Sequence, residues 1–263
     1  LEIGRAQAVQ AEASGILSSV DMNPILLKPE GDRRSQVVVQ GKPIGSMTAT
    51  EYHEYKPRLM PVIEESLTRL RSDYDLVVIE GAGSPAEINL KDRDIVNMHV
   101  AKLADAPVLL VGDIDRGGVF ASFVGTMELL DPDERARVAA FVVNKFRGDI
   151  ALLTPGLSFL TERTGKPVLG VVPYIPDLRI ADEDSLSLEE RMSRRRPSRQ
   201  ELDIVVVRLP RISNYDDVEA LEHEAGVVVR FVEQPDEVRG ADLVILPGSK
   251  STVSDLAWLR ASG

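Results

Sequence analysis

Cysteine is absent from this sequence, and histidine is scarce. With no cysteine among the 263 residues, a disulfide, a thiolate metal site and a cysteine nucleophile are all excluded within the chain. The 3 histidines are scattered, which disfavours a histidine-rich zinc site. No apolar run approaches the roughly 20 residues that span a bilayer, and the amino terminus lacks the basic-then-apolar pattern of a secretion signal. We therefore expect a cytoplasmic protein without a membrane partner.

Basic residues are outnumbered by acidic ones. The 31 Lys and Arg face 42 Asp and Glu, which gives a net charge of −11. A charge of this sign argues against general affinity for nucleic-acid phosphates or anionic membranes. Because 43% of the residues are apolar, the chain can bury a sizeable core. We expect a globular protein that binds small molecules or proteins and no nucleic acid.

An alternation of strands and helices runs through the middle of the chain. Four short β-branched runs without polar alternation predict buried strands, at 75–80, 107–113, 138–144 and 167–173. Longer segments with helical spacing separate them, at 93–105, 118–130 and 149–165. This order implies right-handed crossovers, and hence an α/β fold with a doubly wound parallel sheet. Upstream, the sequence predicts a strand or edge hairpin at 35–45 and a helix at 61–72.

A charged segment, residues 182–201, interrupts this alternation. It contains almost no large apolar residue, so we interpret it as a solvated linker, with a basic nucleic-acid or targeting patch as the alternative. Strand patterns then resume at 202–210, 226–233 and 241–252. The predicted organisation is a first domain at 1–181, a linker at 182–201 and the amino-terminal part of a second domain at 202–263. Helical patterns at both ends of the chain lead us to expect a segment of a longer protein.

An acidic residue ends the first predicted strand. Ligands bind beyond the carboxyl ends of the strands in an open parallel sheet. Glu80 lies at such an end, and Gly81 and Gly83 follow it closely. A carboxylate at this point suits Mg²⁺ that bridges nucleotide phosphates. The alternative is a structural acid that caps a helix or pairs with a lysine.

The second predicted strand ends in a denser polar group. Asp113, Asp115 and Arg116 come first, and Gly117 and Gly118 follow where a helix begins. An anion could meet free N–H groups at this helix start. The alternative is an Asp–Arg surface pair with a glycine cap.

The third predicted strand ends at Asn144. Its amide could meet a purine edge, although an isolated asparagine at a strand end is more often a turn former. A nucleotide fold ordinarily carries a G-x-x-x-x-G-K-[ST] phosphate loop, and this sequence has none.

Together these stretches resemble the cobyric acid synthase family. The matching segments cover the chain from end to end: "EIGRAQAVQAEASG" (2–15), "DMNPILLKP" (21–29), "EYHEYKP" (51–57), "VIEGAGSPAEINL" (78–90), "DIDRGGVFAS" (113–122), "VVNKFRGDIALLTPGL" (142–157), "GKPVLGVVPY" (165–174), "RLPRISNYDD" (208–217) and "DLVILPGSKSTVSDLAWL" (242–259).

The resemblance implies an architecture and a reaction. The first domain would be P-loop NTPase or dethiobiotin synthetase-like, and the second would be the start of a class I glutamine amidotransferase-like domain. The reaction would use ATP and Mg²⁺ to amidate peripheral carboxylates of adenosylcobyrinic acid a,c-diamide, a corrinoid, giving adenosylcobyric acid. Glutamine would supply the ammonia.

The resemblance also assigns residues to the nucleotide. It implies that Glu80 binds Mg²⁺, with Glu12 as a further metal ligand. The residues that would face the phosphates, or the carboxylate being activated, are Asp113, Asp115 and Arg116. Asn144 would approach the adenine.

Other residues are assigned to the corrinoid and to glutamine hydrolysis. Asn23 and Lys28 would bind the corrinoid. Gly248 and Ser249 would lie where the oxyanion-hole loop of such glutaminases runs.

Two family features are missing from the sequence. These are the phosphate loop and the cysteine nucleophile of the glutaminase with its histidine partner, so we expect this chain alone to be inactive. One alternative is a non-catalytic pseudoenzyme or scaffold that binds a nucleotide or corrinoid. Another is an ATP-dependent ligase of the dethiobiotin synthetase type, which the second-domain segments disfavour.

Overall fold

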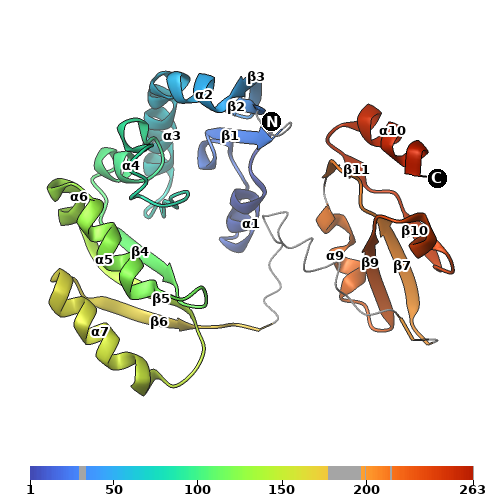
Figure 1. The fold of residues 1–263 in the computed structure, drawn as a ribbon. Coiled ribbons are helices and arrows are strands. Elements are labelled where there is room, and N and C mark those ends of the chain that lie inside the picture. The colour runs from blue at the N-terminus through green and yellow to red at the C-terminus, as the bar shows by residue number, and fades with distance from the viewer. Residues whose placement is uncertain (30–33, 177–196, 199, 214, 263) are drawn as a thin grey trace. The chain divides into compact units, whose positions relative to one another are not determined.

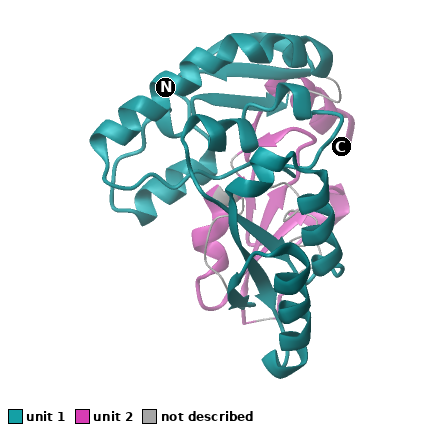
Figure 2. Ribbon diagram, turned by 90° about the vertical axis from the view of Figure 1, so that its left-hand side faces the viewer, with its two compact units in different colours: residues 1–178 teal, residues 179–263 magenta. Residues whose placement is uncertain are grey.

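Two compact units make up the chain. The computed structural model describes residues 1–29, 34–176, 197–198, 200–213 and 215–262. The units comprise Leu1–Leu178 and Arg179–Gly263 (Figure 2). Most of the predicted linker, residues 182–196 and 199, lies outside the described residues. None of the helices in the described part of the chain combines the length and the apolar character needed to cross a membrane.

The first unit begins with a small antiparallel sheet that the sequence predicted only in part. Helix α1 (Arg5–Ala13) precedes three strands in the order β1-β2-β3, at Ile25–Pro29, Arg34–Val39 and Lys42–Thr48 (Figure 1). The expected hairpin is confirmed as β2 and β3. Gln40 and Gly41, with φ of 48° and 71°, form the two-residue turn between them, because a tight hairpin favours positive φ at both central residues.

Two further helices pack beside this sheet. Helix α2 (Ala49–Tyr55) begins with a capping box between Thr48 and Glu51, and α3 (Met60–Asp73) confirms the helix predicted at 61–72. A small apolar core holds this region together, formed by Leu59, Ile63, Ile95 and Val100.

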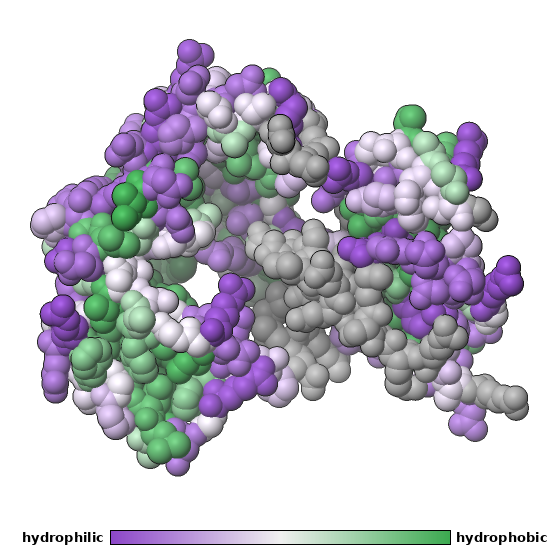
Figure 3. All heavy atoms as spheres, viewed as in Figure 1, coloured by the Kyte–Doolittle hydropathy of each residue, from purple (hydrophilic) through white to green (hydrophobic). Residues whose placement is uncertain are grey.

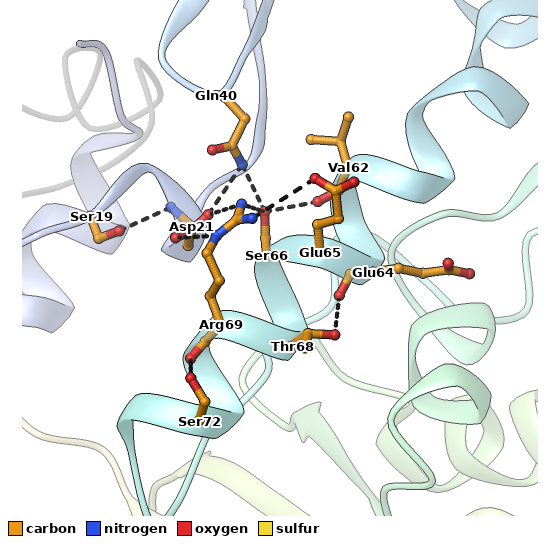
Figure 4. Close-up of polar contacts among 10 residues, drawn as sticks. All are labelled: Ser19, Asp21, Gln40, Val62, Glu64, Glu65, Ser66, Thr68, Arg69 and Ser72. Atoms are coloured by element: carbon orange, nitrogen blue, oxygen red, sulfur yellow. Dashed lines mark hydrogen bonds and ion pairs between the residues drawn. The ribbon is translucent and has the colours of Figure 1, made fainter.

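A polar network ties α3 to the turn before β1 (Figure 4). Asp21 accepts two hydrogen bonds from Arg69, at 2.7 and 3.0 Å. Gln40 donates to Ser66 Oγ at 2.7 Å and to Asp21 at 3.3 Å. The hydrogen bond from Arg69, above all, holds the pKa of Asp21 below its ordinary value. The hairpin turn and the helix are thus joined both through the Asp21 carboxylate and by the direct bond from Gln40 to Ser66.

The second half of the first unit is a parallel α/β layer. Its strands lie in the order β4-β5-β6, at Val108–Asp113, Val138–Phe146 and Val168–Pro173. The helices between and before them are α4 (Met98–Leu103), α5 (Val119–Leu129), α6 (Pro132–Arg137) and α7 (Ile150–Thr164). These strands and the helices α5 and α7 confirm the predicted α/β class. Helix α4 is shorter than the predicted 93–105, and α6 was not predicted.

The two faces of this sheet differ. On one face, Leu110, Phe141 and Val143 are buried in a core that includes residues of α5 and α7. Leu109 and Val111 flank Leu110 and so point to the opposite face, where they are 52% and 62% exposed. On the side that faces the viewer in Figure 3, hydrophobic residues also gather at the surface of this half of the unit. The prediction of a buried strand at 107–113 is therefore wrong for one face of β4 in the described residues.

The strand predicted at 75–80 is not formed. Residues 76–83 have no regular secondary structure apart from a bend at Gly83, and Leu76 and Val78 are 79% and 86% exposed. A strand needs a neighbouring strand to pair its N–H and C=O groups. No strand in the described residues pairs with this segment, so its apolar run does not belong to a sheet.

The second unit contains another parallel sheet. Its order is β10-β7-β9, at Leu243–Ile245, Leu202–Val207 and Val227–Val232. A short antiparallel pair joins β8 (Ile212–Ser213) to β11 (Gly248–Ser249), and the helices are α9 (Glu219–Glu222) and α10 (Thr252–Ser262). Within the sheet, Arg230 of β9 donates two hydrogen bonds to Asp203 of β7, at 2.7 and 2.8 Å. The second alternation of strands and helices, predicted after residue 202, is therefore observed in the order of these elements.

Candidate functional site

The carboxyl ends of β4, β5 and β6 bring a set of charged residues together. Asp113 and Asn144 are register partners at the ends of β4 and β5. Lys145 Nζ lies 2.9 Å from Asp113 Oδ2, and Arg116 Nε lies 3.7 Å from the same oxygen. We call this the strand-end cluster, and it comprises Asp113, Asp115, Arg116, Asn144, Lys145 and Arg147. The residues predicted at the ends of β4 and β5, Asp113 and Asn144, therefore lie side by side at one edge of the sheet.

Two acids of the cluster are held by three cations. Arg147 Nε forms an ion pair with Asp115 Oδ1 at 3.1 Å, while the Asp115 N–H donates to Asp113 Oδ1 at 3.0 Å. The hydrogen bond from Lys145, above all, holds the pKa of Asp113 below its ordinary value. Both oxygens of Asp113 are therefore engaged, whereas the Arg116 side chain is 84% exposed. Arg116 is the cation in this cluster that is best placed to meet a ligand from solution.

Two glycines turn the chain from β4 into α5. Gly117 and Gly118 have φ of 77° and 68°, a left-handed conformation that glycine adopts without steric cost. Gly118 is the N-cap of α5, and no side chain caps the first N–H groups of this helix. Such N–H groups carry partial positive charge. This helix start is therefore compatible with the anion site predicted from the sequence.

Asn144 and the end of β6 complete the edge. The Asn144 side-chain oxygen accepts the Lys145 N–H at 2.9 Å, and Lys145 has φ of 60°. This is the local turn bond considered from the sequence, and it leaves the Asn144 Nδ2 group as its donor toward a ligand. Arg147 lies over the ring of Tyr174, with the guanidinium carbon 3.3 Å from the ring centroid.

Glu80 lies in a separate cluster. Its Oε2 accepts a hydrogen bond from Gln10 Nε2 at 2.8 Å, across 70 residues of sequence. Behind it, the Asn97 side chain accepts from Ala82 N at 3.0 Å and donates to Ala82 O at 2.9 Å. Among the described residues, no hydrogen bond or ion pair joins Glu80 to the strand-end cluster. Neither Gln10 nor Asn97 could be predicted from the sequence, because neither stands in a strand-end pattern.

Glu12 does not share the side of α1 that carries Gln10. Glu12 lies two residues after Gln10 on α1, which corresponds to about 200° around the helix, and it is exposed. A helix that presents Gln10 to Glu80 therefore turns Glu12 away. In the described part of the chain, no three His, Cys, Asp or Glu side chains gather as a metal site. Glu80 itself still fits Mg²⁺, because this ion commonly takes only one or two carboxylates from protein.

The predicted corrinoid residues make contacts within the amino-terminal region. Asn23 accepts from Gly4 N at 2.9 Å and donates to Ile25 O at 3.2 Å. Lys28 Nζ lies 2.8 Å from Glu2 Oε2, and both side chains are 44% exposed. The Asn23 amide thus stabilises the chain locally, whereas the partly exposed Lys28 remains accessible.

In the second unit, Gly248 and Ser249 form strand β11. The Ser249 hydroxyl donates to Asp255 Oδ2 at 2.6 Å and accepts from Ser251 N at 2.9 Å. Asp255, only 2% exposed, also accepts from Arg211 N at 3.2 Å. The Ser249 side chain is therefore used to fix its own loop. The role of Asp255 could not be predicted from the sequence, because an acid in the first turn of a helix such as α10 is common.

Two family models match these two units. The model described as "AAA domain" matches residues 47–181, which is more than half of the chain. The chain belongs to this AAA-domain family. Its AAA domain contains the strand-end cluster and the Glu80 loop, and the predicted P-loop-type fold class is confirmed. The model described as "CobB/CobQ-like glutamine amidotransferase domain" matches residues 203–263, which include Gly248 and Ser249.

Similar curated proteins are named cobyric acid synthase. The protein from Sorangium cellulosum (strain So ce56) is 74% identical over 262 residues, which are 100% of this chain and 50% of that protein. The one from Dehalococcoides mccartyi (strain CBDB1) is 58% identical over 262 residues, 100% of this chain and 52% of that protein. The one from Geobacillus kaustophilus (strain HTA426) is 52% identical over 263 residues, again 100% and 52%.

These matches confirm the predicted resemblance to the cobyric acid synthase family, which is a family of enzymes. The chain spans about half the length of the curated relatives it matches. No solved structure matches it significantly.

Proposed function

We propose that this chain contributes to the ATP- and glutamine-dependent amidation of peripheral carboxylates of adenosylcobyrinic acid a,c-diamide, which yields adenosylcobyric acid. Residues 1–181 would form the domain that binds the nucleotide and the corrinoid, residues 182–201 the linker, and residues 202–263 the beginning of the glutaminase domain. The observation that carries the proposal is the 74% identity to a cobyric acid synthase along the whole chain.

The Glu80 loop would hold the metal side of the nucleotide. ATP with Mg²⁺ supplies the phosphoryl group that activates a carboxylate, and ammonia then displaces phosphate. Glu80 offers a hard oxygen ligand, and Gln10 occupies only its Oε2 atom among the described residues. Gly83, with φ of 66°, lets the backbone turn sharply after the carboxylate.

The strand-end cluster would face the reacting anions. Arg116 is exposed and next to Asp113, so it can approach a phosphate while the acids fix the neighbouring cations. An anion beside Gly117 and Gly118 would meet the first N–H groups of α5, because the helix start has no side-chain cap. The Asn144 Nδ2 group would donate to the adenine. Positioning and charge stabilisation of this kind account for most of the catalysis of phosphoryl transfer.

Gly248 and Ser249 would contribute to the glutaminase through their backbone. Because the Ser249 hydroxyl bonds to Asp255, stabilisation of an oxyanion would come from main-chain N–H groups of this loop. The chain contains no cysteine, so we propose that by itself it neither hydrolyses glutamine nor forms amides. Ammonia released from glutamine by the purified chain would contradict this statement.

A chimera tests the function directly. In the Sorangium cellulosum enzyme, the matched half would be replaced by this chain, and amide products would be measured by mass spectrometry with ATP, glutamine and the diamide substrate. We expect product formation, and we expect Glu80→Gln to lower the rate by at least about 10–100-fold, the loss typical of residues around a metal. A folded but inactive chimera beside an active parent enzyme would refute the proposal.

A further inference from the structure

The loop that carries Glu80 has almost no backbone support of its own. Among the described residues, no backbone-to-backbone hydrogen bond involves residues 75–83. The segment is also outside every sheet. A carboxylate on an unsupported loop samples many positions, and the entropy lost on binding a ligand then weakens the interaction. Something else must define where Glu80 lies.

The side chain of Asn97 takes the place of a neighbouring strand. Its Oδ1 accepts the Ala82 N–H at 3.0 Å, and its Nδ2 donates to Ala82 O at 2.9 Å. A longer contact reaches Ser84 O at 3.5 Å. Both backbone groups of one residue are thereby satisfied by one amide. A Cβ on Gly81 would overlap Asn97 Oδ1, so glycine at this position lets the two segments approach closely.

Asn97 is itself firmly anchored. It stands between Ile95 and Met98, which are 6% and 3% exposed and belong to two different apolar cores of the first unit. The Asp94 carboxylate accepts from the N–H groups of Val96, Asn97 and His99, at 3.0, 3.0 and 3.1 Å. Burial by itself would raise the pKa of Asp94, but these donors hold it below its ordinary value. The charged form of Asp94 therefore fixes the backbone of Asn97.

We propose that Asn97 is a positioning residue, which binds the backbone of the Glu80 loop and thereby sets the place of the Glu80 carboxylate. The functional part of this inference rests on the proposed role of Glu80 as a cation ligand. The amide at residue 97 accepts from Ala82 N–H with its oxygen and donates to Ala82 O with its nitrogen, whereas an ionised carboxylate at this position would keep only the acceptor.

Amide hydrogen exchange in this chain tests the clamp. In Asn97→Ala the Ala82 amide should exchange about 5–10-fold faster, the factor that corresponds to one lost hydrogen bond. In Asn97→Asp the acceptor for this amide is kept, so its exchange should lie closer to that of the wild type. Ser84→Ala is the matched control, because the Ser84 hydroxyl accepts from Ala86 N and takes no part in the clamp. Unchanged exchange at Ala82 in Asn97→Ala would overturn the inference.

Binding of Mn²⁺ alone, followed by paramagnetic broadening of the Gly81 and Gly83 amide signals, tests the consequence. Asn97→Ala and Asn97→Asp should both weaken the broadening several-fold at a given Mn²⁺ concentration, and Ser84→Ala should not. Faster exchange at Ala82 with undiminished broadening would overturn the positioning role. Glu80→Gln separates the metal role of Glu80 from the clamp by Asn97. If this variant leaves the broadening unchanged, the metal role of Glu80 is refuted. Hydrogen exchange at Ala82 then still decides whether Asn97 holds the loop.

Discussion

The carboxylate of Glu134 holds three separate elements of the first unit together, and its removal should be costly. Its side chain is 6% exposed and lies 2.7 Å from Lys91 Nζ and 3.2 Å from Lys102 Nζ. It also accepts the Asp131 N–H at 3.0 Å. Lys91 belongs to the turn Lys91–Arg93, Lys102 to α4 and Glu134 to α6. Their shared carboxylate therefore connects these three segments directly.

The change to make is Glu134→Gln, which keeps the volume and removes the charge. Hydrogen bonds to charged groups contribute about 1.5–3 kcal/mol each, and two of them would be weakened. Lys91 and Lys102 keep Asp131 and Asp133 as partners, at 2.9 and 2.8 Å. The loss should therefore fall below the about 3–5 kcal/mol of a fully broken buried pair. We expect the free energy of unfolding to drop by about 2–3 kcal/mol, a fall in Tm of about 4–12 °C.

Urea unfolding followed by far-UV circular dichroism measures this loss. The single tryptophan, Trp258, lies in α10 of the second unit, so its fluorescence transition should stay in place. Asp133→Asn is the control, because Asp133 is 65% exposed and an exposed pair contributes less than about 1 kcal/mol. A Glu134→Gln protein within about 0.5 kcal/mol of the wild type, or an equal loss in Asp133→Asn, would refute the reasoning.

The same variant has a defined pH dependence. Burial alone would raise the pKa of Glu134, but the bonds from Lys91, the Asp131 N–H and Lys102 hold it below the ordinary 4.5. A lowered pKa in the folded state means that the stabilisation is fully present above the unfolded-state value and is lost as pH falls through the folded-state value. The difference between wild type and variant should therefore be constant at neutral pH and shrink below pH 4.5.

Two further predictions concern other contacts of the first unit. Gly112→Ala should lower the free energy of unfolding by about 1–3 kcal/mol, because its Cβ would lie 2.5 Å from a phenylalanine ring of α5. A Cβ added at Gly125, in the interior of α5, would meet nothing within 4 Å. Gly125→Ala should therefore raise the free energy of unfolding by about 0.5–1 kcal/mol. Equal thermal stabilities of the Gly112→Ala and Gly125→Ala proteins would contradict the packing argument. The Asp21 pKa, lowered chiefly by Arg69, should rise toward its ordinary value in Arg69→Met, as measured by NMR titration. Because the pKa of Asp21 is lowered in the folded state, the stabilisation from the Arg69–Asp21 pair is lost as pH falls below 3.8. An unchanged Asp21 pKa in Arg69→Met would exclude Arg69 as the cause of the lowered pKa.

Most of the parallel strands could be predicted from local pattern. β-Branched runs at 107–113, 138–144 and 167–173 became β4, β5 and β6 with ends shifted by one or two residues. The equally apolar run at 75–80 did not become a strand, because pairing depends on a neighbour that no local pattern specifies. Composition described that segment correctly as apolar, and the tertiary arrangement decided that it stays outside the sheet.

The candidate site likewise contains residues that local pattern predicts and residues that it does not. Residues at strand ends could be predicted, since parallel strands place their carboxyl ends at one edge and so bring Asp113 to Asn144. The residues that hold the site could not be predicted. Gln10 meets Glu80 across 70 positions, Asn97 meets Ala82 across 15, and no periodicity links either pair.

The sequence by itself determined the fold class, the polar strand ends and the relationship to cobyric acid synthases, because each is written in short local patterns of residue type. Only the tertiary structure decided that Gln10 meets Glu80, that the Ser249 hydroxyl is taken by Asp255, and that Asn97 contacts the Glu80 loop. These are questions of which side chains meet after folding, and the direction of a side chain follows from packing between distant segments and not from its neighbours in the chain.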